Sequence, residues 1–206
     1  MITTEHIISK SLLAGICIGI GCYISLLNSN QIVNSFLFSF GFLLCSIFEL
    51  NLFTGRINDI SVSSDFRRLF LILILNIMSV VFTGIIISTL DSDIISLADN
   101  YFLENKYNIP YLSIIVKSFI TGLIISIPFE FNKFNKQNNI IIFILCCIAV
   151  YLIGGFHIIA DLFYYSASSL SINNIGFVLL TSLITLLFNF IGCNFINLFI
   201  NKSFMH

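Results

Sequence analysis

Long apolar runs without a fixed charge make up most of the chain, and short polar stretches divide them. The first run, residues 11–48, is 38 residues long, which is too much for one membrane crossing and suits two. The polar residues 28–31 divide this run. The pattern predicts a single transmembrane domain over residues 1–206 with six spans: 10–27, 33–56, 69–90, 110–131, 139–166 and 176–200.

Two of these spans contain residues that do not suit a transmembrane helix. The second span ends in Glu49-Leu-Asn-Leu-Phe-Thr-Gly55, and the fifth contains Gly154-Gly-Phe-His-Ile-Ile-Ala-Asp161. Two adjacent glycines interrupt a helix at low steric cost. A polar side chain in the middle of a membrane is costly and points to a functional site. We therefore expect two broken helices, with His157 inside the second break.

The sequence also repeats itself. Residues 10–20 (KSLLAGICIGI) match residues 117–127 (KSFITGLIISI), so spans one and four are counterparts. Spans three and six share a short pattern that begins at Asn76 and at Asn189. A repeat of three spans reverses its direction across the membrane. The predicted fold is an all-α integral membrane protein of six helices, an inverted 3+3 repeat in which the second and fifth helices are broken, with the site where the breaks meet.

Composition and charge narrow the class of protein. Only 9% of the residues are charged and 58% are hydrophobic, whereas a soluble domain has about 25% charged residues. The net charge of −1 argues against nucleic acid as a partner. Basic residues gather between spans two and three and between spans four and five, whereas the predicted loop of residues 91–106 is acidic. The positive-inside rule then predicts a multi-pass protein of the cell membrane with both termini in the cytoplasm.

Nothing in the sequence indicates catalysis or metal binding. All six cysteines lie inside apolar runs, and no pair has the CxxC spacing of a metal site. We find no carboxylate pair and no nucleophile with a base at catalytic spacing. We expect no enzyme activity, no catalytic residue, no metal and no cofactor.

Three short motifs, in order along the chain, carry a family resemblance. The first leads from Gly41 to Leu52-Phe-Thr-Gly55, the second is Gly155-Phe-His-Ile-Ile-Ala-Asp161, and the third is Asn189-Phe-Ile-Gly192. They resemble the broken second helix, the broken fifth helix and the sixth helix of the formate/nitrite transporters. These are pentameric channels for small monovalent anions with an aquaporin-like fold. The resemblance covers nearly the whole chain and implies that fold, in a homopentamer within the lipid bilayer.

The resemblance also implies roles for residues at the two breaks. His157 matches the central histidine of the family's pore, and Thr54 matches its hydrogen-bonding partner. Leu52 and Phe53 match the cytoplasmic constriction.

Four further positions match the family less directly. Phe38 and Tyr151 correspond to the periplasmic constriction, and Ser126 falls where the family has a fourth-helix asparagine. The family's fourth-helix lysine has no clear equivalent, because Lys106 and Lys117 both sit at shifted positions; Lys117 is the predicted pore residue.

The sequence therefore predicts a channel or transporter for small monovalent anions or their weak acids, such as formate, nitrite or hydrosulfide. Moving an isolated anion into a medium of low dielectric costs tens of kcal/mol. Protonating a carboxylate with a pKa of about 4 costs only about 4 kcal/mol at pH 7. We expect the anion to acquire a proton near His157, which makes transport coupled to protons.

Two departures from the family keep other functions open. Phe156 stands where the family has a glutamate, and Asp161 stands where it has an asparagine. One alternative is a neutral-solute or water channel of the same fold. The other is a membrane assembly protein that transports nothing.

Overall fold

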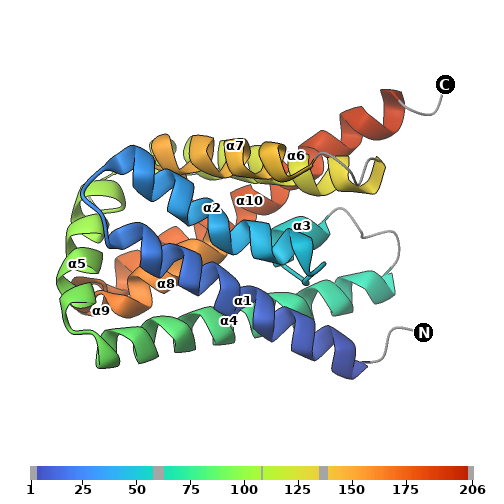
Figure 1. The fold of residues 1–206 in the computed structure, drawn as a ribbon. Helices are drawn as coiled ribbons and strands as arrows, with labels where there is room; N and C mark the ends of the chain where they lie inside the picture. The colour runs from blue at the N-terminus through green and yellow to red at the C-terminus, as the bar shows by residue number, and fades with distance from the viewer. Residues whose placement is uncertain (1–3, 58–62, 108, 135–138, 204–206) are drawn as a thin grey trace.

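The computed structural model shows an all-helical chain (Figure 1) and describes residues 4–57, 63–107, 109–134 and 139–203. Within these residues the helices are α1 (Thr4–Leu26), α2 (Gln31–Ile47), α3 (Phe53–Arg56), α4 (Ser63–Leu90), α5 (Asp93–Asn105), α6 (Tyr111–Phe134), α7 (Asn139–Leu152), α8 (Ile158–Ala167), α9 (Ser169–Asn173) and α10 (Ile175–Ser203).

Within the part of the chain that the structure describes, four helices are long and apolar enough to cross a membrane. They are Thr4–Leu26, Phe66–Leu90, Tyr111–Phe131 and Ile175–Phe195, which correspond to the predicted spans one, three, four and six. The other two predicted spans are divided into shorter apolar helices, α2 with α3 and α7 with α8. The predicted breaks in spans two and five are therefore confirmed.

One segment differs from the prediction. Residues 93–105, which we expected to be a loop, form the helix α5. Ile94, Ala98 and Phe102 recur every fourth residue and are completely buried, so this short helix presents one apolar stripe to the rest of the protein. The acidic residues between them hid that stripe in the sequence.

The two repeats pack in the same way. In the first half, α1 packs against α2 and α4, and in the second half, α6 packs against α7 and α10. Gly15 on α1 and Gly122 on α6 lie directly against the backbone of Asn76 and of Asn189, where a Cβ atom would collide. Glycine at these matching positions allows α1 to approach α4 closely in the first half and α6 to approach α10 closely in the second half.

The ends of the helices fall into two groups at opposite ends of the bundle (Figure 1). The start of α1, the end of α10, α3 and the start of α4 lie at one end, while α5 and α9 lie at the other. The start of α1 and the end of α10 therefore lie at the same end of the bundle, as the predicted even number of spans requires.

Candidate functional site

The first break is a tight helix end followed by a new helical turn. Glu49 adopts a left-handed backbone conformation with φ of 49°. The amide of Leu50 donates to the carbonyl of Cys45 at 2.8 Å, and the amide of Glu49 donates to the carbonyl of Ser46 at 3.1 Å. This pair of hydrogen bonds is the Schellman motif that ends many helices. After three more residues the chain re-enters a helix at Phe53.

The second break repeats this geometry. Gly154 is left-handed with φ of 61°. The amide of Gly155 donates to the carbonyl of Val150 at 2.9 Å, and the amide of Gly154 donates to the carbonyl of Tyr151 at 3.0 Å. The chain re-enters a helix at Ile158. Leu52 and His157 are therefore equivalent residues, each immediately before the second half-helix.

A buried asparagine from the third helix of each half holds each break in place. In the first half, Asn76 on α4 accepts a hydrogen bond from the amide of Phe53 at 2.8 Å. Its side-chain amide donates to the carbonyls of Ser11 at 2.8 Å and Asn51 at 3.0 Å. A break inside a membrane frees backbone groups that water cannot reach, and this one side chain satisfies groups on both sides of Leu52.

Asn189 does the same in the second half. It accepts a hydrogen bond from the amide of Ile158 at 3.0 Å. It donates to the carbonyls of Ser118 at 2.8 Å and Phe156 at 2.9 Å. Ser11 and Ser118 are matched by the sequence repeat, so the inverted repeat extends to individual hydrogen bonds.

His157 and Thr54 meet where the two breaks come together. The ring Nε2 of His157 lies 3.0 Å from the hydroxyl oxygen of Thr54, and both side chains are buried. The ring Nδ1 accepts a hydrogen bond from the amide of Ala160 at 3.2 Å, so His157 caps the start of α8. An amide can only donate, so Nδ1 carries no proton in this arrangement. The proton of the neutral ring is then on Nε2, from where it is donated to Thr54.

An aromatic path leads from His157 toward the end of the bundle that holds α5. The ring of Phe42 lies edge-on to His157 with centroids 5.0 Å apart. Phe38 follows at 5.2 Å from Phe42, and Tyr151 lies 5.3 Å from Phe38. The structure thus brings together Phe38 and Tyr151, the two residues matched to the periplasmic constriction. Phe42 links them to the histidine and was not identified from the sequence.

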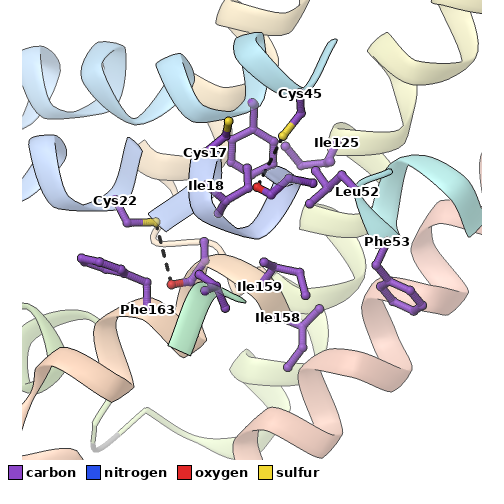
Figure 2. Packing of buried hydrophobic residues seen from close by; sticks show 14 of the residues in the cluster. Cys17, Ile18, Cys22, Cys45, Leu52, Phe53, Ile125, Ile158, Ile159 and Phe163 are labelled. Atoms are coloured by element: carbon purple, nitrogen blue, oxygen red, sulfur yellow. Dashed lines mark hydrogen bonds between the residues drawn. The ribbon is translucent and has the colours of Figure 1, made fainter. Parts of the chain in front are cut away.

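The two residues that precede Thr54 are apolar and buried. Leu52 is completely buried and Phe53 is 3% exposed. Figure 2 shows Leu52 pointing into the cluster around Ile125 and Cys45, whereas Phe53 points in another direction. Neighbouring residues at the start of a helix diverge in this way, so the two side chains present apolar surface in different directions.

Two residues selected from the sequence, Ser126 and Lys117, contact groups other than His157. Ser126 is buried, and its hydroxyl donates to the carbonyl of Leu123 within its own helix at 2.8 Å. Lys117 is half-buried, with its ammonium next to Gly154 at the second break.

The lysine beside the centre of the site is Lys106, at the end of α5. It is completely buried, and its ammonium lies 2.8 Å from a carboxylate oxygen of Asp161. It also donates to the carbonyl of Gly155 at 2.7 Å and lies 4.1 Å from the centre of the Phe156 ring. In the sequence, Lys106 is a basic residue at the end of an acidic segment, and Asp161 is an acidic residue in an apolar span. Only the fold shows that the two side chains form a pair.

Comparison with known proteins shows a likeness in structure but none in sequence. No family model matches the sequence, and no curated protein matches it. The structure is similar to a solved structure described as an FNT family ion channel, with a TM-score of 0.78 and 18% sequence identity. The likeness covers 97% of this chain and 90% of that one. This is the kind of protein that the interrupted motifs resemble, and the chain therefore has the fold of an FNT family ion channel.

Proposed function

We propose that this protein is a membrane channel for small monovalent anions, which cross its apolar parts as weak acids. The observation that carries the proposal is the buried pair of His157 and Thr54 at the junction of two broken helices. The Phe42 ring lies edge-on to His157, and Leu52 and Phe53, the two residues before Thr54, are buried. A polar pair among apolar side chains gives a small polar solute one place to form hydrogen bonds during its passage.

In this proposal His157 is a fixed hydrogen-bonding group that holds no second proton. A second proton could go only to Nδ1, and it would displace the amide of Ala160 that the ring accepts. It would also place a positive charge at the positive end of the α8 dipole. We therefore infer that the proton that neutralises the anion comes from water with the substrate, while His157 and Thr54 bind the solute.

Replacing Thr54 with valine tests the role of this pair. Valine keeps the shape of the side chain but leaves the Nε2 proton of His157 without an acceptor, which costs about 1–3 kcal/mol for a buried donor. We expect formate flux into proteoliposomes to fall about tenfold or more. Thr83→Val is the matched control, because the Thr83 hydroxyl bonds only within its own helix, to the carbonyl of Ser79. Equal flux through the two variants would contradict the proposal.

The same flux assay distinguishes the proposed anion channel from the two alternative functions. Labelled formate, nitrite, hydrosulfide, lactate and glycerol are compared in the wild-type protein. A neutral-solute channel is the second candidate, because the charges of Lys106 and Asp161 cancel beside the site. It would pass glycerol faster than formate. A protein of membrane assembly would pass none of the five solutes.

We further propose that the protein forms a homopentamer in the cell membrane, which native mass spectrometry in mild detergent can test. We also propose that both termini lie in the cytoplasm, which thiol labelling can test. Glu104 on α5 and Arg67 near the start of α4 are exposed, and α5 and the start of α4 lie at opposite ends of the bundle. Cysteine at Glu104 is expected to react with an impermeant reagent outside intact cells, whereas cysteine at Arg67 is expected to be protected. The reverse pattern would invert the topology.

A further inference from the structure

The buried ion pair of Lys106 and Asp161 lies against both sides of the second break. Lys106 contacts Gly155, two residues before His157, and Asp161 follows four residues after it. The lysine side chain is 0% exposed and the aspartate side chain is 3% exposed. Both charges therefore act on the centre of the site through protein rather than through water. Protein screens charges much less than water does.

The two charges cancel for a solute that approaches His157. Lys106 alone would place a full positive charge beside the pathway, in a region where a counter-ion from solution is absent. A monovalent anion would be attracted there and held. With a carboxylate oxygen 2.8 Å from the ammonium, the buried pair presents a short dipole to a solute several ångströms away. The half-buried ammonium of Lys117 beside Gly154 remains as a separate charge, and the substitutions below leave it unchanged.

Several contacts hold the ammonium of Lys106 in place. It is bound by Asp161 and by the Gly155 carbonyl, and the Phe156 ring covers it at 4.1 Å. These contacts occupy the directions in which it could bind a passing anion. Charge-assisted hydrogen bonds of this kind are the strong ones in proteins, so the lysine stays paired while a solute moves past.

We propose that Asp161 is a specificity-determining residue, which neutralises Lys106 and so excludes permanently charged anions from a pathway that admits weak acids. The inference rests on the proposed function, since it assigns the class of substrate to the same site. Formate passes because it can take up a proton. Nitrate, which is of similar size, is the anion of a strong acid and stays charged.

The test is the ratio of nitrate flux to formate flux in proteoliposomes at pH 7. Wild-type protein is expected to pass formate and to exclude nitrate. Asp161→Asn keeps an oxygen for the lysine but removes the negative charge, and we expect it to raise the ratio about tenfold or more. Asp93→Asn changes the net charge equally at an exposed position and is expected to leave the ratio unchanged.

A double variant makes the test independent of the folding of Asp161→Asn. Lys106→Gln combined with Asp161→Asn removes both charges, so it is expected to pass formate and to exclude nitrate as the wild type does. A double variant that admits nitrate or blocks formate overturns the inference, as does Asp161→Asn with a wild-type ratio. Wild-type protein that passes nitrate as readily as formate overturns the inference alone, whereas passage of neither ion refutes the proposed function itself.

Discussion

Replacing Lys106 with methionine is expected to lower the free energy of unfolding by about 3–5 kcal/mol, the usual cost of removing one partner from a buried ion pair. Lys106 is completely buried against Asp161. The substitution leaves the carboxylate of Asp161 in an apolar region without its cation. Methionine has a similar length and adapts to irregular surroundings, so lost packing contributes little. Denaturation of the purified protein in one detergent measures the effect.

The double variant Lys106→Met with Asp161→Leu separates charge from packing. Exchange of a buried ion pair for apolar side chains of similar volume is often neutral or stabilising. We expect the double variant to be about 1–3 kcal/mol less stable than the wild type, because the carbonyl of Gly155 loses the hydrogen bond from Lys106. A double variant that is as unstable as Lys106→Met would show that packing of the lysine chain and its hydrogen bond to Gly155, and not the ion pair, stabilise this region.

The second large effect is expected at Asn189. Replacing it with leucine leaves the amide of Ile158 and the carbonyls of Phe156 and Ser118 without their partner. Each buried backbone group left unsatisfied costs about 1–3 kcal/mol. We therefore expect a loss of about 3 kcal/mol or more in the free energy of unfolding, together with loss of formate flux, because the break positions His157.

Two further variants serve as references for this prediction. Asn76→Leu removes the equivalent three hydrogen bonds in the first half and is expected to cost a similar amount. Asn194→Leu is the control, since the Asn194 amide donates to the carbonyl of Phe190 within its own helix. If Asn189→Leu is no less stable than Asn194→Leu, the three bonds do not hold the break.

The spans, the breaks and the central pair could be predicted because each leaves a local signal. An apolar run of fixed length predicts a crossing, and glycines or polar residues inside it predict a break. The repeat relates residues 10–20 to 117–127, and that relation led to the inverted architecture. His157 and Thr54 were identified by motif, and the structure brings them to 3.0 Å.

Lys106 and the role of the asparagines could not be predicted, for different physical reasons. The stripe of Ile94, Ala98 and Phe102 is short and lies among acids, so α5 resembled a loop, and Lys117 was preferred to Lys106 as the pore residue. Asn76 and Asn189 were visible as a repeated pattern. Their function depends on backbone groups that become unpaired only once the helices break, and a sequence pattern does not show which side chain will reach them.

The two asparagine-held breaks have a consequence for the order in which the protein is made. All the partners of Asn76 lie within the first 76 residues, and all the partners of Asn189 lie between residues 118 and 158. Each half can thus close its own break as it enters the membrane. The contacts of Thr54 with His157 and of Lys106 with Asp161 join the halves afterwards.

Lys106 is synthesised 55 residues before Asp161. At about 5–20 residues per second, its ammonium is exposed for roughly 3–11 s before its partner exists. Because an unpaired charge in hydrocarbon is costly, α5 is expected to remain in the water at the membrane surface during this interval. We expect it to fold inward only when the fifth span delivers the carboxylate, so α5 takes its place late in membrane insertion, shortly before the sixth span is added.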